Sequence, residues 1–116
     1  MNPTRIEPGA RWSQAVIDGS TVYIAGQVAN APVPDSALTQ TQQVLANIDR
    51  LLAQAGSDKT KILSATIWLS DMKHYADFNA AWDAWMDRAH PPARACVQSV
   101  LARSEWKVEI MVTARV

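Results

Sequence analysis

Two charged residues interrupt apolar strand patterns near the C-terminal end of the sequence. Arg94 lies within residues 91–98, and Glu109 stands between Val108 and Ile110. A charge at such a position is costly to bury unless it has a partner. A guanidinium can grip a carboxylate with two parallel hydrogen bonds, and a glutamate can orient or deprotonate a water molecule. A small anionic ligand could therefore be the partner of the arginine.

The same pattern also fits a structural ion pair between Arg94 and a carboxylate such as that of Glu109. Pattern alone leaves both interpretations open. If the last two strands pair as a hairpin around Ser104, Arg94 lies opposite position 114. Glu109 is then five residues away, which is roughly 16 Å at about 3.3 Å per residue. In that register one chain could not assemble the site, and the two residues would have to converge from different subunits.

Other reactive residue types give weaker signals. Cys96 alone is more typical of an inert core residue than of a nucleophile, and we expect a backbone role for it at most. His74 and His90 are expected at the surface or in caps. Neither forms a metal-ligand spacing with Cys96, so we predict no metal and no cofactor.

Composition limits the class of protein. The 116 residues fit one domain, residues 1–116, with 48% apolar and 19% charged residues. Eleven basic and eleven acidic residues cancel, and no basic block is present, so nucleic acid and anionic membranes are poor candidates for partners. No apolar run approaches the roughly 20 residues of a membrane span, and no secretory signal is evident. With a single cysteine, these features favour a cytoplasmic protein.

Periodicity predicts the elements that must position the candidate residues. A helix is expected over about residues 37–55, capped by Asp35 or Ser36 and stopped by Gly56. A second helix is expected over about residues 73–88, after Asp71. Asp18-Gly19 predicts a hairpin turn. Strands are expected over residues 12–17, 21–25, 62–70, 93–101 and 107–116.

The resulting order, β-β-α-β-α-β-β, predicts an α+β fold with two helices on one face of a sheet. Six strand residues together leave too much apolar surface for two helices to cover alone. We therefore predict self-association. These six residues are Ala15, Ile17, Val97, Val108, Ile110 and Val112.

Aromatic residues are interpreted as packing residues. The recurrence of Tyr75, Phe78, Trp82 and Trp85 every three or four residues is more typical of a core stripe than of a cofactor site. The five tryptophans, which include Trp12, are expected to fill the core or a subunit interface.

Several of these motifs together resemble one known family. Residues 92–97 (PARACV) and 108–110 (VEI) resemble the C-terminal signature of the RidA/YjgF family. Residues 22–28 (VYIAGQV) resemble that family's SGQ strand. Residues 11–13 and 80–85 are similar to its YoaB-like branch. The resemblance extends through nearly the whole chain.

The resemblance implies a chorismate-mutase-like fold, a homotrimer and sites in clefts between subunits. It also implies hydrolysis of reactive enamine and imine intermediates, such as 2-aminoacrylate, to 2-keto acids and ammonia. Arg94 would bind the substrate carboxylate and Glu109 would position water. Trp12 would contribute a ring, and backbone N–H groups near Gly26 and Cys96 would bind remaining lone pairs of the substrate.

Two positions depart from the family pattern. Ala25 replaces the usual serine or threonine before Gly-Gln, and Trp12 replaces a tyrosine. Both changes make the expected pocket more apolar. The alternative to an imine deaminase is therefore a non-catalytic trimer that binds small keto or amino acids or interacts with other proteins. Ribonuclease activity, suggested for relatives, is disfavoured by the zero net charge.

Overall fold

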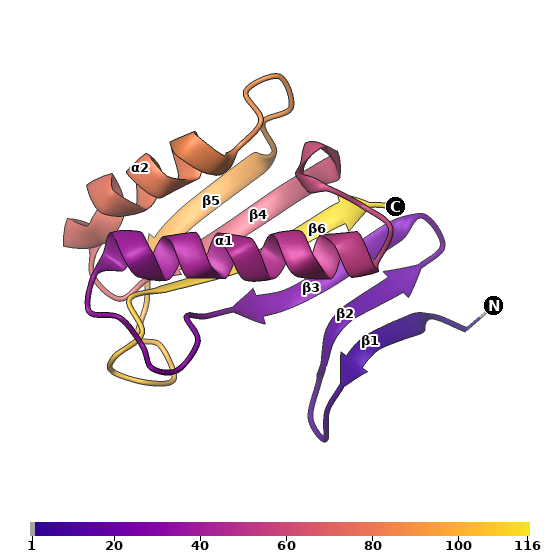
Figure 1. Ribbon diagram of the computed structural model, residues 1–116, viewed down its shortest axis with the longest axis horizontal. Helices are drawn as coiled ribbons and strands as arrows, with labels where there is room; N and C mark the ends of the chain where they lie inside the picture. The colour runs from indigo at the N-terminus through magenta and orange to yellow at the C-terminus, as the bar shows by residue number, and fades with distance from the viewer. Residues whose placement is uncertain (1) are drawn as a thin grey trace.

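The computed structural model describes residues 2–116, which form a single sheet covered by two helices (Figure 1). The elements follow the order β1-β2-β3-α1-β4-α2-β5-β6. The strands are β1 (Thr4–Pro8), β2 (Ser13–Asp18), β3 (Thr21–Gln27), β4 (Ile62–Leu69), β5 (Ala93–Gln98) and β6 (Val108–Arg115). The helices are α1 (Ala37–Gln54) and α2 (Tyr75–Trp85), and the short 3₁₀ turns are η1 (Lys59–Lys61) and η2 (Met72–His74).

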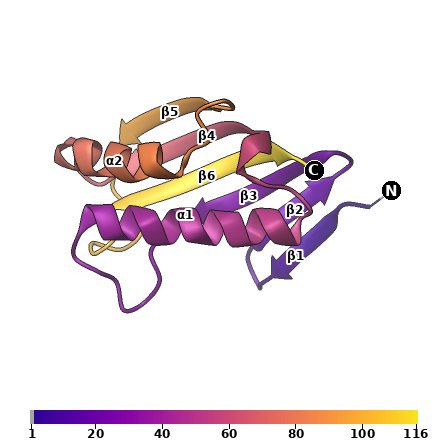
Figure 2. The same cartoon turned by 45° about the horizontal axis from the view of Figure 1, so that its top comes forward.

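Both helices lie on the same face of the sheet, as Figure 2 shows after a 45° turn. The predicted α+β class and the one-sided placement of the helices are thus confirmed. The sheet contains one strand more than predicted, because β1 pairs with β2 at the edge. Only Ile6 of this strand is partly buried, so β1 lacks the apolar alternation that reveals a strand.

The last two strands, β5 and β6, do not form a hairpin, so the register in which Arg94 lies opposite position 114 does not occur. The sheet order is β1-β2-β3-β6-β4-β5, so β4 lies between β5 and β6. Helix α2 connects β4 to β5, and the two strands are parallel, which is the arrangement that a helical crossover permits. The remaining strand, β6, then pairs antiparallel with the free side of β4.

Local signals fix most element ends. Gly19 has φ +60° in the two-residue turn between β2 and β3, where a glycine avoids strain. Ser36 accepts a hydrogen bond from the Thr39 N–H at the start of α1, and Gly56, with φ +77°, follows its end. The second helix is shorter than the predicted 73–88. Asp71 caps η2 instead, and extended backbone at Met86 ends α2.

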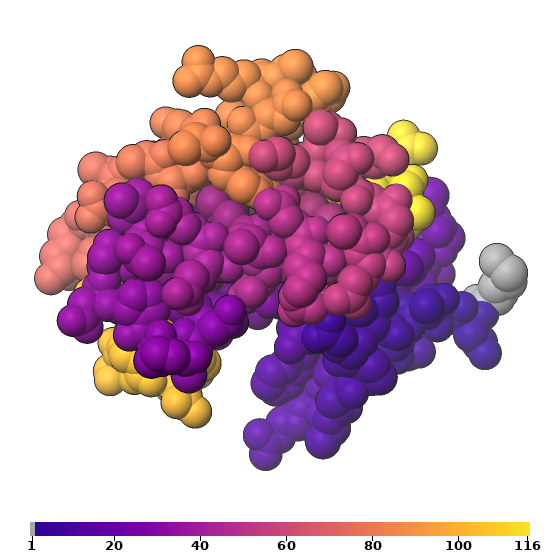
Figure 3. Space-filling view, viewed as in Figure 1, coloured from indigo at the N-terminus to yellow at the C-terminus, as the bar shows by residue number. Residues whose placement is uncertain are grey.

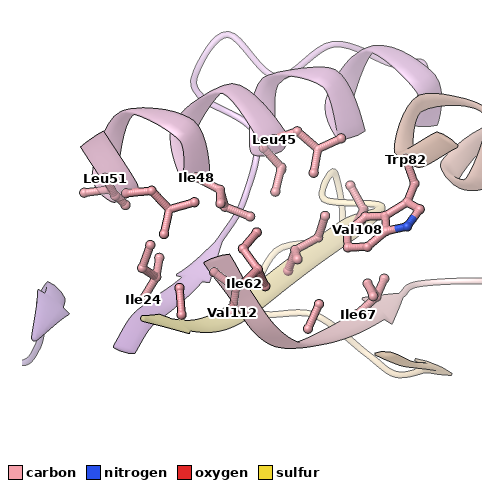
Figure 4. Packing of buried hydrophobic residues seen from close by; sticks show 14 of the residues in the cluster. Ile24, Leu45, Ile48, Leu51, Ile62, Ile67, Trp82, Val108 and Val112 are labelled. Carbon is pink, nitrogen blue, oxygen red and sulfur yellow. The ribbon is translucent and has the colours of Figure 1, made fainter. Parts of the chain in front are cut away.

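The core lies between the helices and the sheet. Figure 4 shows side chains of α1 pointing toward those of β3, β4 and β6, with Trp82 of α2 beside them. The prediction that the helices leave strand residues such as Val108, Ile110 and Val112 uncovered is therefore wrong, since each is at most 1% exposed. Apolar side chains are instead exposed elsewhere on the strands, at Tyr23, Leu63, Val97 and Met111. Within residues 2–116 neither helix has the length and apolar character needed to cross a membrane.

Candidate functional site

The Arg94 guanidinium is held by helix α2. Its Nη1 donates to Asn79 Oδ1 at 2.9 Å, and its Nη2 donates to the Tyr75 hydroxyl at 3.1 Å. The guanidinium carbon also lies 5.3 Å from the centre of the Phe78 ring and 5.5 Å from that of Trp82. Stacking on aromatic faces stabilises a cation through the ring quadrupole. Five residues thus make an arginine site, which we call the Arg94 cage: Tyr75, Phe78, Asn79, Trp82 and Arg94.

Arg94 has no carboxylate partner within residues 2–116. The ion pairs in this part of the chain join Arg50 to Glu7, His90 to Asp87 and Arg103 to Glu105. The interpretation of Arg94 and Glu109 as one chain's structural ion pair is therefore excluded. A partly buried cation whose hydrogen-bond partners are all neutral retains its attraction for an anion.

Helical spacing explains how the cage forms. Tyr75, Asn79 and Trp82 occupy positions i, i+4 and i+7 of α2 and so share one face. The expected core role is confirmed for Phe78 and Trp82, which are 0% and 3% exposed. Tyr75 is 39% exposed and contacts Arg94 instead. Asn79 was not among the predicted site residues, although a polar residue on an aromatic helix face is a usable signal.

Cys96 lies two residues beyond Arg94 on β5 and faces the core side of the sheet. Burial raises the pKa of its thiol, and the nearby Arg94 charge offsets this only in part. The thiol is therefore protonated near neutral pH, which disfavours a nucleophilic role.

Glu109 lines a separate hollow of about 350 Å³. Figure 3 shows, at the lower edge of the molecule, a notch between the tip of the β1–β2 hairpin and the loop before β6, the two segments that supply Trp12 and Trp106. Trp12 is 60% exposed, so it does not fill the core, and its expected place in a subunit interface stays a prediction. The lining residues are Trp12, Ala25, Gly26, Val28, Ala102, Trp106 and Glu109.

Gly26 makes room for the Glu109 carboxylate. The register of β3 against β6 shifts between Ile24 and Gln27, so Ala25 and Gly26 sit in a bulge. A Cβ added at Gly26 would overlap Glu109 Oε2 and would lie 3.0 Å from its Cδ. The close approach expected of this glycine is therefore made by Glu109 of the same chain.

Glu109 sits in an environment that favours its neutral form. Burial raises the pKa of its carboxyl above the ordinary value, and no ion pair within residues 2–116 opposes this effect. A carboxyl of this kind is suited to accept a proton closer to neutral pH.

The loop that carries Trp106 is fastened by α1. The buried Gln40 side chain donates to Glu105 O at 2.9 Å and accepts from the Lys107 N–H at 2.9 Å. Trp106, between them, forms one wall of the hollow, and its buried indole N–H has no acceptor within residues 2–116. Trp106 was not among the predicted site residues.

Comparison with known proteins identifies the family. The family model described as "Endoribonuclease L-PSP" matches residues 2–116. This model represents the RidA/YjgF family, and the chain therefore belongs to that family. It is 48% identical over 114 residues to a RutC family protein of Haemophilus influenzae, covering 98% of each chain. It is 43% identical to the RutC family protein YoaB of Escherichia coli over the full length of both. The likeness to YoaB confirms the branch expected from the sequence.

Solved structures support the same assignment. The crystal structure of NMB1025, a YjgF family member from Neisseria meningitidis, superposes with a TM-score of 0.95 at 44% identity, covering 99% of this chain and 95% of that one. A more distant relative is named 2-iminobutanoate/2-iminopropanoate deaminase, from Capra hircus. It is 33% identical over 113 residues, which cover 93% of this chain and 80% of that protein.

In this RidA-family chain the predicted site residues form two groups. Arg94 pairs in register with the buried Ala65, so it lies on the helix-covered face of the sheet. Glu109 alternates with the buried Val108 and Ile110 and therefore lies on the opposite face, with Trp12 and Gly26. With β4 between them, β5 and β6 are about 10 Å apart. One subunit does not bring Arg94 and Glu109 together.

Metal-binding residue types are dispersed in the RidA-family chain. Across residues 2–116, no group of three or more His, Cys, Asp or Glu side chains is placed to hold a metal ion. The chemistry available at the two groups of site residues is therefore that of a cation, a carboxyl group and apolar walls.

Proposed function

We propose that the protein hydrolyses 2-imino acids and their enamine tautomers to 2-keto acids and ammonia, in clefts between the subunits of a homotrimer. The observation that carries the proposal is Arg94, a partly buried cation with neutral partners and no carboxylate partner within residues 2–116. A substrate carboxylate is the counter-ion that completes this arrangement. The resemblance to a named 2-imino acid deaminase supports the same substrate class.

The proposed chemistry needs positioning more than strong acid or base power. Arg94 binds the substrate carboxylate, and water adds to the electrophilic carbon of the C=N bond. Glu109 of a neighbouring subunit accepts a proton from that water and passes it to the imine nitrogen, which gives a carbinolamine. The hydroxyl proton of the carbinolamine then moves to the amino nitrogen as the C–N bond breaks, so ammonia leaves and the C=O group of the keto acid forms. The raised pKa of Glu109 fits a group that accepts a proton and returns it.

Apolar residues on the open face of the sheet support the trimer. Tyr23 and Met111 are 51% and 41% exposed there, and Val97 is 48% exposed. Such a surface is typical of an interface rather than of a monomer. Solution scattering at micromolar concentration should therefore give a trimer mass. A monomer mass would contradict both the assembly and the intersubunit cleft.

The activity is tested by generating 2-aminoacrylate in situ with a dehydratase and measuring pyruvate release. We expect wild type to accelerate the release and Arg94→Ala to give no acceleration over buffer. Arg88→Ala is the matched control, because Arg88 is an exposed arginine outside the cage. An Arg94→Ala variant as fast as wild type would reject the site assignment.

The alternative is a trimer that binds keto or amino acids without catalysis. It is favoured by Ala25, which lines the hollow and provides no hydroxyl for a substrate. Keto-acid binding without acceleration of pyruvate release by wild type would select this alternative.

A further inference from the structure

The hydroxyl of Tyr75 has a free proton beside the Arg94 guanidinium. Its oxygen accepts a hydrogen bond from Arg94 Nη2 at 3.1 Å, so the phenolic hydrogen must point elsewhere. No acceptor for that hydrogen is found in residues 2–116. Tyr75 is 39% exposed, whereas Phe78 and Trp82, on the inner side of the cage, are buried. The free O–H is therefore on the accessible side of the cage.

Some donors of Arg94 have no hydrogen-bond partner in residues 2–116. A guanidinium has five N–H groups, and two of them reach Asn79 and Tyr75. The ring centres of the buried Phe78 and Trp82 lie 5.3 and 5.5 Å from its carbon. A carboxylate that binds the free N–H groups would come within reach of the Tyr75 hydroxyl. A phenol that accepts from a cation is also polarised to donate more strongly to an anion.

We infer that Tyr75 is a specificity-determining residue of the site, whose hydroxyl donates a hydrogen bond to the substrate carboxylate bound by Arg94. The inference rests on the proposed function for the identity of the substrate. It extends that function by assigning carboxylate recognition to two residues, Arg94 and Tyr75. Ligands with a neutral group in place of the carboxylate gain nothing from this pair of donors.

The decisive variant is Tyr75→Phe, which removes the hydroxyl and keeps the ring that lies 5.9 Å from the guanidinium carbon. Calorimetric titration with 2-oxobutanoate should show binding about tenfold weaker than in wild type, the effect of one hydrogen bond to a charged group. Titration with the neutral 2-oxobutanamide should be unchanged. In the imine assay, KM should rise about tenfold while kcat stays within about twofold.

The matched control is Tyr23→Phe, which removes the other tyrosine hydroxyl of the sequence, on a strand that does not contact the cage. It should leave the affinity for 2-oxobutanoate at the wild-type value, provided that the mass in solution is also unchanged. Comparison of the two variants separates the loss of this hydroxyl from the loss of any tyrosine hydroxyl.

Three outcomes would overturn the inference. One is an unchanged affinity of Tyr75→Phe for 2-oxobutanoate, and another is an equal loss for acid and amide, which indicates a structural role. The third is a wild type that binds no 2-oxobutanoate, which removes the carboxylate site altogether. A wild type that binds the keto acid through Tyr75 but does not accelerate pyruvate release upholds the inference and rejects the deaminase function.

Discussion

Arg94 and Glu109 lie on opposite faces of the sheet, and strand β4 separates the strands that carry them. Each is partly buried without an opposite charge beside it in residues 2–116. An internal ion pair would satisfy both charges and leave little affinity for a ligand. Their separation keeps a cation available for a carboxylate and a carboxyl available for water.

Replacement of Glu109 by Gln should abolish most activity and leave binding intact. The amide keeps the size of the side chain but cannot accept the proton, so kcat should fall by roughly 10²- to 10⁴-fold. Because the pKa of Glu109 is raised, the wild-type rate should decline on acidification at a higher pH than an ordinary glutamate would give. A pH–rate profile checks this limb, and a Glu109→Gln variant with wild-type kcat would remove Glu109 from the chemistry.

The same variant should be more stable than wild type at neutral pH. A carboxyl whose pKa is raised by burial binds more protons in the folded state than in the unfolded state, so stability falls as pH rises above its ordinary value of 4.5. The amide of the variant cannot ionise, so its stability does not fall with rising pH for this reason. Thermal unfolding should give Glu109→Gln the higher Tm at pH 7, with a difference that shrinks below pH 4.5. A constant difference across this range would contradict the assigned cause.

Gly26→Ala should damage catalysis more than folding. The added Cβ overlaps the end of the Glu109 side chain, which can rotate away, and Gly26 has no positive φ that would strain an alanine. We therefore expect a small change in Tm and a large fall in kcat, because the carboxylate leaves its position. Gly9→Ala, whose Cβ would meet only the Trp12 carbonyl oxygen at 3.3 Å, serves as the comparison. A loss of folded protein specific to Gly26→Ala would show a structural role instead.

Asn79→Asp should lower the affinity for keto acids and raise the stability of the fold. The Asn79 oxygen already lies 2.9 Å from Arg94 Nη1, so a carboxylate in its place gives the arginine an internal counter-ion. The affinity for 2-oxobutanoate should fall at least tenfold, while the Tm rises at pH 7. The rise should disappear on acidification through the pKa of the new carboxyl, because only its ionised form pairs with Arg94. Unchanged keto-acid affinity would indicate that ligands do not use Arg94.

The local structure could be predicted from the sequence because its signals are short-range. Ser36 and Gly56 mark the ends of α1 whatever the rest of the chain does, and Gly19 marks the first turn. The pairing of β5 with β4 could not be predicted in this way. It depends on the path of α2 across the sheet, and the chain segment between β5 and β6 reads equally well as a hairpin connection.

The candidate site was likewise predictable only in part. Arg94 and Glu109 could be predicted as site residues because each places a charge within an apolar strand pattern. The partners of Arg94 could not be predicted, because an aromatic stripe such as that of Tyr75 and Phe78 has the same spacing whether it covers the core or a guanidinium. The role of Trp106 could not be predicted for another reason. Its position depends on Gln40, which is 66 residues earlier in the chain.

Mixed trimers test whether Arg94 and Glu109 act across a subunit boundary. Arg94→Ala subunits retain Glu109, and Glu109→Ala subunits retain Arg94, so a cleft between one of each kind can be intact. Random exchange of equal amounts makes about one cleft in four intact in a cyclic trimer, so about a quarter of the wild-type rate should return. The measurement is pyruvate release before and after subunit exchange, with exchange verified by mass spectrometry of differently tagged subunits. Each variant mixed with itself should remain inactive. If both residues instead acted within one chain, no mixture would contain an intact site, and verified exchange without recovery would reject the intersubunit cleft.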